Sequence, residues 1–379
     1  VDWLTWTFLY RRLAQNPNYY GQAERTARHL SEHLSQLVDQ ACEELATAKC
    51  IEIEESSIAP LNLGIIAAYY GLDYLTVEMM AMSLQANTKL RGILEIVSAS
   101  NEFASLLPIR HGEASMLARI LENCPIQPAA PRFSDPHLKC NILLQAHFSR
   151  LSLPADLEAD QRKAVCQAHT LVQAIVDVIA SHGWLGPALA AMEFCQMLVQ
   201  AQWDFESPLK QLPHFSHGLL KTAAEIGVES VFDLIDDEEK RAQLLAQLKP
   251  AQVSAIAEVV NAYPNVEVDF ELSPETASAG DPVSIVAQIK RDQCSSTAVP
   301  AAFFSARKDE AWWLLVGSPA EKTLLGIKRV TPKPGVPVTP VSIEFAAPQA
   351  SASLKVYLIS DCWLGCDQEF DTSIAIANY

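Results

Sequence analysis

The chain has 379 residues, of which 49% are hydrophobic, and carries 45 acidic against 28 basic side chains, a formal net charge of −17. This length suits about two to four domains, and the apolar content supports a sizeable core, which excludes a largely disordered protein. The acidic balance excludes a surface that binds nucleic acid over most of its area, because such binding depends on clustered Lys and Arg.

The cysteines and the apolar runs indicate a reduced cytosolic or nuclear compartment. The nine cysteines are scattered apart from Cys362 and Cys366, and the sequence has neither an N-x-[ST] acceptor nor an apolar leader. The most apolar helical run, residues 165–194, is interrupted by polar residues and Pro187, so it does not predict a membrane span. The chain begins at Val1 within a helical pattern, and we expect a fragment of a longer protein.

The sequence pattern of residues 1–58 predicts part of a winged-helix-like segment. A helical pattern over 2–15 ends at Asn16-Pro17, and an amphipathic helix over 31–50 follows, with Ser31 as its expected cap and "CIEIEESS" as a strand. In "WTFLYRRLAQNPNYYG", aromatic side chains surround Arg11 and Arg12, a combination that proteins use to stack bases and hold phosphates. One arginine pair cannot offset a charge of −17, so an RNA-binding strip is the weaker interpretation of this stretch.

Residues 59–205 predict a bundle of seven helices separated by breaks that contain Pro or Gly. The expected helices cover 62–71, 74–84, 87–98, 112–123, 136–151, 157–182 and 187–203. The sixth helix is apolar around most of its circumference, with one narrow polar stripe of Thr170, Gln173 and Asp177. A helix that tracks nucleic acid needs Lys or Arg there, so packing is expected, while base contacts from Gln173 stay open.

Residues 206–263 predict a compact helix-loop-helix domain, with helices at 216–226, 229–235, 238–247 and 250–262. From residue 264 to residue 379 the apolar period changes to two, which predicts about eight short strands and an immunoglobulin-like or fibronectin type III-like sandwich. The strand-like runs are "VEVDFEL", "PVSIVAQIK", "PAAFFSA", "AWWLLVG", "KTLLGIKRV", "VSIEFAA", "SLKVYLIS" and "EFDTSIAIA". Neighbours on a strand face opposite sides, so one ring of Trp312 and Trp313 is expected in the core and the other outward. The predicted fold class is multidomain α + β.

No motif predicts catalysis or a resident cofactor. The 14 glycines form no phosphate-binding loop, and the acidic run "IDDEEKR" begins a helix, where acidic side chains favour the dipole. "HLSEH" places His29 and His33 on one helical face, as in the H-x-x-E-H pattern of zinc proteases, but offers no clear third ligand. Cys362 and Cys366 have no second Cys or His pair beside them. We therefore expect no catalytic residue, no cofactor and no metal.

The order of these four segments resembles the Sec63 unit that follows the motor domains in one branch of superfamily-two helicases. Seven strings in the same order narrow the resemblance to the last, second cassette of the spliceosomal U5 RNA helicases, with a fungal source expected. The strings are "YRRLAQNPNYY", "APLNLGIIAAYY", "SASNEF" followed by "PIRHGE", "NILLQAHFSR", "GWLGPALAAMEFCQM", "LKQLPHF" and "SDCWLGCDQE". The resemblance covers the whole chain.

The resemblance implies a nuclear, ATP-dependent parent helicase with two motor cassettes, which unwinds the paired U4 and U6 RNAs in pre-mRNA splicing. It implies that the second cassette regulates the helicase and docks splicing factors, and that a bundle helix, equivalent to residues 164–182, is a ratchet for single-stranded RNA. Trp6, Phe8 and Tyr10 are then expected to pack against parts of the parent outside this sequence.

Three hypotheses follow from these observations. The first is a non-catalytic interaction and regulatory module, whose partners are spliceosomal proteins and the parent's own motor cassettes in cis, with RNA contact weak or indirect and no membrane contact. The second is a ratchet domain that grips single-stranded RNA and contributes directly to unwinding. The third is a zinc hydrolase that uses His29 and His33. The candidate RNA or partner contacts are Thr170, Gln173, Asp177, Trp312, Trp313, Arg11 and Arg12, with outward strand residues near the tryptophans and the acidic segment 236–239 as the expected docking faces.

Overall fold

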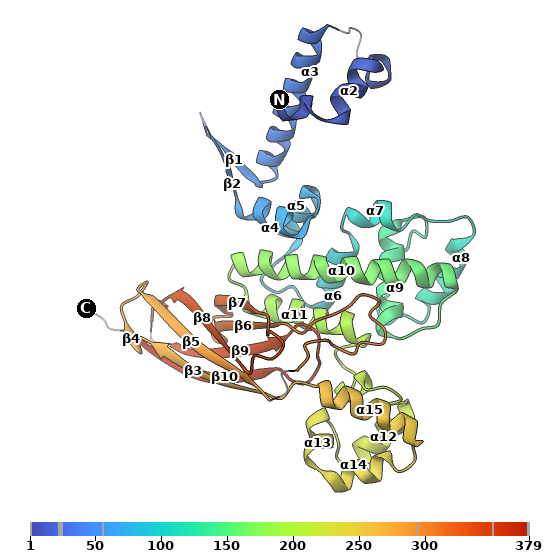
Figure 1. Cartoon of the computed structure of the whole chain (residues 1–379), viewed down its shortest axis with the longest axis vertical. Helices are drawn as coiled ribbons and strands as arrows, with labels where there is room; N and C mark the ends of the chain where they lie inside the picture. The colour runs from blue at the N-terminus through green and yellow to red at the C-terminus, as the bar shows by residue number, and fades with distance from the viewer. Residues whose placement is uncertain (1, 22–25, 55–56, 293–294, 351, 377–379) are drawn as a thin grey trace. The chain divides into compact units, whose positions relative to one another are not determined.

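The computed structural model describes residues 2–21, 26–54, 57–292, 295–350 and 352–376. The chain forms two compact units, Val1–Met79 and Met80–Tyr379 (Figure 1). Each unit contains both helices and β-strands, which confirms the predicted mixture of α and β structure.

The first unit contains a small helical core and a β-hairpin. Its elements are α1 (Asp2–Thr5), α2 (Phe8–Gln15), the 3-10 helix η1 (Pro17–Tyr20), α3 (Ala27–Thr47), β1 (Ile51–Ile53), β2 (Ile58–Pro60), α4 (Asn62–Tyr70) and the start of α5 (Tyr74–Ser83). Leu13 of α2 packs with Leu30 and Leu34 of α3. The predicted cap at Ser31 is wrong, because Thr26 caps α3 by accepting a hydrogen bond from the main-chain N–H of His29.

A group of packed helices opens the second unit. Its helices are α6 (Leu90–Ser98), α7 (Glu102–Leu106), α8 (Glu113–Leu121), α9 (Pro136–Phe148), α10 (Ala155–Ser181) and α11 (Leu185–Gln200). The helices predicted within 87–203 are confirmed, although the sequence pattern does not predict the short α7. The helices predicted at 62–71 and 74–84 also form, but they lie in the first unit or at its border.

The long helix α10 is the centre of this group. It is long and apolar enough to cross a membrane, yet 56% of its most apolar window is buried inside the protein. It packs along α9 and α11 (Figure 1). Because apolar side chains on most of its sides are fully buried, including Leu171, Ile175 and Val178, its hydrophobicity is that of a core helix.

A buried ion cluster fixes the N-terminal half of α10 to α8 and α9. The completely buried Nζ of Lys139 lies 2.8 Å from a carboxylate oxygen of Glu113 and 2.7 Å from one of Asp160. Arg110 pairs with the same carboxylates from the more exposed side. Burial opposes ionisation of both acids, but the hydrogen bonds from the two cations outweigh it and lower the pKa of Glu113 and of Asp160.

The four predicted helices of the next segment are confirmed. After the 3-10 helix η2 (Pro208–Gln211) come α12 (His217–Glu225), α13 (Val231–Asp236), α14 (Glu238–Leu245) and α15 (Pro250–Ala262). Local capping explains two of the starts. Ser230 and Asp233 form a reciprocal capping box at α13, and the side chain of Asp237 accepts a hydrogen bond from the main chain of Lys240 at α14.

Two β-sheets complete the second unit. One has the order β3 (Val266–Ser273), β5 (Pro282–Arg291), β8 (Val338–Ala346), and the other has the order β4 (Thr276–Ala277), β10 (Gln368–Ile376), β9 (Ala352–Ser360), β6 (Trp312–Ser318), β7 (Thr323–Val330). The rings of Phe270 on β3 and Phe370 on β10 meet edge to face across the two sheets, with centroids 5.7 Å apart. Among the described residues, seven of the eight predicted runs contain strands.

The run "PAAFFSA", residues 300–306, is a correction, because it forms a loop rather than a strand. An isolated bridge joins Ala298 to Asp309 at its base. Phe304 leaves the sheets and packs edge to face on His169 of α10, with ring centroids 5.4 Å apart. The apolar residues of this loop therefore serve the contact with α10 rather than a strand.

Candidate interaction surfaces

The polar stripe of α10 is partly engaged within the chain. Thr170, Gln173 and Asp177 are all half-buried, and Nε2 of Gln173 lies 3.2 Å from Nδ1 of His169. The ring of His169 packs on Phe304. Burial lowers the pKa of His169 to about 4, so the ring is neutral at pH 7 and adds no positive charge to the stripe.

The loop that carries Phe304 contacts a second position on the same side of α10. Sγ of Cys166 lies 3.3 Å from Oγ of Ser305. Positions 166, 170, 173 and 177 follow the three-and-four spacing of one helical face. The structure therefore brings the three predicted stripe residues together on one face, part of which is covered by the chain's own loop.

Lys163 extends this stripe and is missing from the sequence-based candidates. Its side chain is 57% exposed, and its Nζ lies 4.0 Å from a carboxylate oxygen of the buried Asp160. Lys163 stands seven residues before Thr170, two helical turns along the same face. That spacing is the signal that could have found it. The stripe thus carries a cation at one end and Asp177 at the other.

The prediction that one tryptophan of β6 faces outward is wrong. Trp312 is 0% exposed and Trp313 is 2% exposed. Nε1 of Trp312 donates a hydrogen bond to Glu310, while the guanidinium of Arg329 lies 4.7 Å from the ring centroid of Trp313. The two rings do face opposite sides, but every residue of β6 is buried, since the other sheet covers one face and α11 packs on the other. The expectation that outward strand residues beside these tryptophans form a docking face is therefore also wrong for β6.

The N-terminal aromatic residues are exposed in the first unit. Trp6 is 87% exposed and Phe8 is 81% exposed, and Arg11 and Arg12 are exposed on α2. Tyr10 is half-buried and packs against the small core of Leu13, Leu30 and Leu34. This apolar and basic surface, here called the N-terminal aromatic surface (Trp3, Trp6, Phe8, Arg11 and Arg12), is therefore available for contact in the isolated chain.

A buried loop between β9 and β10 joins the three parts of the second unit. We call residues 360–367 the junction loop. Three glutamine side chains hold it: Gln196 donates to the carbonyl of Ser360 and to Asp367, Gln200 to the carbonyl of Cys362, and Gln211 to the carbonyl of Leu364. The hydroxyl of Tyr263, at the end of α15, also donates to Leu364.

Most of the junction loop is buried: residues 360–364 and 366 are inside the protein, while Gly365 and Asp367 are exposed. Cys362 and Trp363 are 0% exposed, and Gly365 has a positive φ of 82° with the ring of Pro208 close to where a side chain would begin. Burial raises the pKa of the Cys362 and Cys366 thiols well above their usual range, so both stay protonated near neutral pH. The sequence pattern does not predict the role of Gln196 and Gln200 on α11, because their hydrogen-bond partners lie more than 160 residues away.

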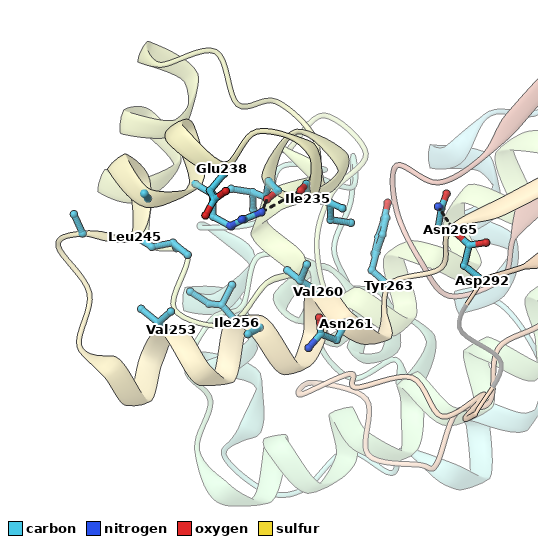
Figure 2. A pocket seen from close by; sticks show the side chains of 15 residues that line it. Ile235, Glu238, Leu245, Val253, Ile256, Val260, Asn261, Tyr263, Asn265 and Asp292 are labelled. Carbon is cyan, nitrogen blue, oxygen red and sulfur yellow. Dashed lines mark hydrogen bonds between the residues drawn. The ribbon is translucent and has the colours of Figure 1, made fainter.

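A groove of about 730 Å³ lies beside α15 in the helix-loop-helix segment (Figure 2). Its lining includes Leu245, Val253, Ile256 and Val260, which point into the space between α15 and the α13–α14 segment. Glu238, from the acidic segment predicted as a docking face, lines its upper edge in the view of Figure 2. The acidic segment therefore adjoins an apolar surface.

The histidine pattern of α3 does not assemble into a metal site in the part of the chain that the structure describes. Within those residues, no group of three or more His, Cys, Asp or Glu side chains could hold a metal ion. His29 and His33 are both half-buried on α3. The zinc hydrolase hypothesis thus gains no third ligand there.

Comparisons with known proteins agree with the resemblance seen in the sequence. Residues 60–373 match the Sec63 Brl domain, and residues 1–55 match a winged helix-turn-helix domain. The chain is 44% identical over 379 residues to the U5 small nuclear ribonucleoprotein 200 kDa helicase of Homo sapiens, an alignment that covers 99% of this chain and 18% of that protein.

Two further relatives are similar to the same extent. The U5 small nuclear ribonucleoprotein 200 kDa helicase of Drosophila melanogaster is 43% identical over 100% of this chain and 18% of its own length. A DExH-box ATP-dependent RNA helicase of Arabidopsis thaliana is 41% identical over 99% of this chain and 18% of its own length. The chain thus spans about a fifth of these relatives, and the predicted resemblance to spliceosomal U5 helicases is confirmed. With most of its length matched by the family, the chain belongs to the Sec63 Brl domain family.

Proposed function

We propose that this chain is a non-catalytic interaction and regulatory module of a spliceosomal, ATP-dependent RNA helicase. It is the Sec63 unit of the second, C-terminal cassette, it docks splicing factors, and it contacts the parent's motor cassettes in cis. The names of its relatives, U5 small nuclear ribonucleoprotein helicases and a DExH-box RNA helicase, support the spliceosomal and nuclear setting. We also propose that the parent helicase unwinds the paired U4 and U6 RNAs and that this chain comes from a fungus.

One observation carries the proposal. The polar stripe of α10, the natural place for a strand-gripping surface, has Gln173 beside a neutral His169 and Asp177 with the wrong charge for phosphate. The loop of Phe304 and Ser305 already occupies part of the same side. A surface that is taken up within the chain favours a rigid docking part over an RNA grip.

The junction loop supports the same proposal. Gln196, Gln200, Gln211 and Tyr263 tie the helices, the helix-loop-helix segment and the β-sheets to one buried loop. A docking module benefits from such rigidity, because preorganised surfaces lose less entropy when a partner binds. The net charge of −17 favours basic partners and speeds their association.

The finer architecture belongs to the proposal. We propose a partial winged-helix-like segment at 1–58, a seven-helix ratchet-type bundle at 59–205, a helix-loop-helix domain at 206–263 and an immunoglobulin-like or fibronectin type III-like sandwich at 264–379. The two sheets with the orders β3-β5-β8 and β4-β10-β9-β6-β7 support the last of these.

Lys163 favours one alternative, a ratchet that grips single-stranded RNA. Its exposed ammonium and the amide of Gln173 lie on one face of α10, where a phosphate and a base could both be contacted. Asp177 opposes this function by its charge. The alternative therefore predicts RNA binding that depends on Lys163.

Fluorescence anisotropy with single-stranded RNA separates the two functions. We expect affinity weaker than about 10 μM near physiological salt, with little change in Lys163→Glu or in the matched control Lys221→Glu on α12. Sub-micromolar affinity with a steep salt dependence that Lys163→Glu abolishes, and Lys221→Glu preserves, would establish the RNA grip instead. Crosslinking in nuclear extract, mapped onto this numbering, then tests for splicing factors on the second unit.

A further inference from the structure

The groove beside α15 has an apolar interior that nothing in the described chain fills. Leu245, Val253 and Val260 are half-buried within it, and Ile235 is 39% exposed at its edge. α14 packs on α12 and α13, which leaves its side facing α15 open. Its volume of about 730 Å³ lies within the range of sites that bury drug-sized ligands or anchoring side chains.

Small residues make the groove shallow enough for a helix to approach. Ala242, Ala246 and Ala257 line it and are exposed. Alanine keeps the groove walls low, so the backbone of a ligand can come close while its larger side chains reach the apolar interior. Helix-in-groove recognition uses this arrangement, with anchors at the spacing of one helical face.

The edge of the groove is acidic. Glu238 and Asp292 line it and are exposed, and Asp236 and Glu239 are exposed in the same acidic segment. The one cation among its lining residues, Arg241, donates hydrogen bonds to the carbonyls of Leu234 and Ile235, at 2.8 Å and 3.0 Å, and so neutralises the end of α13. A phosphate ligand is disfavoured here, whereas Lys and Arg are favoured.

We propose that this groove binds an amphipathic α-helix of a protein partner whose apolar stripe is flanked by Lys or Arg. The apolar face fills the space over Val253, Ile256 and Val260, and the basic flanks pair with Glu238 and Asp292. This inference rests on the proposed docking function and assigns it a surface and a partner chemistry. The acidic segment supplies selection by charge, and the apolar interior supplies the affinity.

The test measures binding of a fluorescent peptide of about 14 residues, two heptads of Leu and Lys that form a basic amphipathic helix. The comparison peptides replace every Lys by Glu, or scramble the Leu and Lys order so that no apolar stripe forms. The full chain is titrated at about 150 mM and 500 mM salt, because non-specific attraction to an acidic chain fades at high salt while apolar binding persists.

Groove variants decide where the peptide binds. Ala257→Trp fills the groove without removing a packed side chain, and Ala224→Trp, at an exposed position of α12, is its matched control. We expect the first to weaken binding of the Lys peptide by about tenfold or more and the second to leave it unchanged. Ala242→Trp, from the opposite wall, gives the same readout if Ala257→Trp fails to fold.

Charge variants test the acidic edge. Glu238→Lys is expected to weaken the Lys peptide by about threefold and to reduce its salt dependence, while the exposed control Glu229→Lys does neither. Equal affinity for the Lys and Glu peptides, or no effect of Ala257→Trp, overturns the proposal. Loss of RNA binding in Ala257→Trp would assign the groove to nucleic acid instead.

A second copy of the chain is a rival occupant, because the N-terminal aromatic surface also combines aromatic residues with Arg11 and Arg12. If the chain dimerises, Ala257→Trp abolishes the dimer and the peptide does not bind, then the occupant of the groove is a second copy of the chain rather than a protein partner. The two proposals fail separately. Tight RNA binding through Lys163 would contradict the proposed docking function without changing the peptide result. Peptide binding that Ala257→Trp leaves unchanged would contradict only the assignment of the peptide to the groove.

Discussion

The side-chain amide of Gln200 donates a hydrogen bond to the main-chain carbonyl of Cys362 at 2.6 Å, across a sequence separation of 162 residues. Both groups are buried, at the point where α11 meets the junction loop. This bond, with those of Gln196 and Gln211, makes a loop between two strands part of the helical core. The loop therefore links α11, the helix-loop-helix segment and the strands within the second unit.

Removing the Gln200 amide is expected to destabilise the chain. Gln200→Leu keeps the size of the side chain but leaves the Cys362 carbonyl buried without this donor, which costs about 1–3 kcal/mol in the free energy of unfolding. Denaturant unfolding followed by circular dichroism measures the loss. The control Gln243→Leu, on the exposed side of α14, is expected to change stability by less than about 0.5 kcal/mol. Equal effects of the two variants would contradict the role given to the junction loop.

The stability of the chain is expected to fall as the pH rises from about 4 to 6. Burial raises the pKa of Asp367 to about 6, so the folded state binds its proton more tightly than the unfolded state. The contribution of Asp367 to the free energy of unfolding is complete below the pKa that this carboxyl has in the unfolded chain. It is lost as the pH rises through the pKa of the carboxyl in the folded chain. The pKa of Glu193 is also raised, mainly by burial and further by the negative charges of Asp204 and Asp367. Its titration adds to the same loss of stability with rising pH.

Asp367→Asn isolates this contribution, because the variant cannot titrate at this position. The free energy of unfolding of the wild type relative to the variant should fall between pH 4 and pH 7 and then stay constant, and because the Asp367 side chain is exposed the fall should be smaller than the pKa shift alone implies. Unfolding curves across this pH range give the difference. A flat difference would mean that the Asp367 carboxyl titrates normally in the folded protein.

Lys139→Met is expected to be strongly destabilising. The variant leaves Glu113 and Asp160 buried with Arg110 as their remaining cation in the cluster, and breaking a buried pair in this way costs about 3–5 kcal/mol. Lys163→Met is the matched control, because that lysine is 57% exposed and 4.0 Å from Asp160, and its loss should cost under about 1 kcal/mol. Thermal unfolding of the pair checks the contrast.

Trp313 is expected to act in stability rather than in binding. Trp313→Ala removes a ring that is 2% exposed and should cost about 3–5 kcal/mol, whereas Trp313→Phe should cost clearly less. The alanine variant also removes the ring under Arg329 and loosens the attachment of Arg329 to Asp361. Partner binding lost in Trp313→Phe without loss of stability would restore this residue as a contact.

The N-terminal aromatic surface is expected to drive self-association of the isolated chain. Exposed aromatic side chains favour contact between copies, and Trp6→Ser with Phe8→Ser should raise the dissociation constant of the oligomer several-fold. Sedimentation velocity over a range of concentrations measures it. Tyr69→Ser, at an equally exposed aromatic of α4, is the control, and a similar effect there would remove any special role of α2.

Local patterns predicted the elements well and their surroundings poorly. The period of two found β6 and placed Trp312 and Trp313 on opposite faces, but it could not tell that α11 covers the second face. The same pattern made residues 300–306 look like a strand, although Phe304 packs on His169. Of the groove, the sequence indicated only the acidic segment, because Leu245 and Val260 have the same pattern whether or not another helix covers them.

The sequence by itself determined the order of helices and strands, the acidic character of the chain and its resemblance to Sec63 units, because apolar spacing, charge and short strings are properties of neighbouring residues. Only the tertiary structure decided that both tryptophans are buried, that Gln173 is engaged with His169, that three glutamines hold the junction loop and that an apolar groove stays open beside α15. Each of these depends on which surfaces meet across large sequence separations, and burial is settled by that meeting rather than by any local pattern.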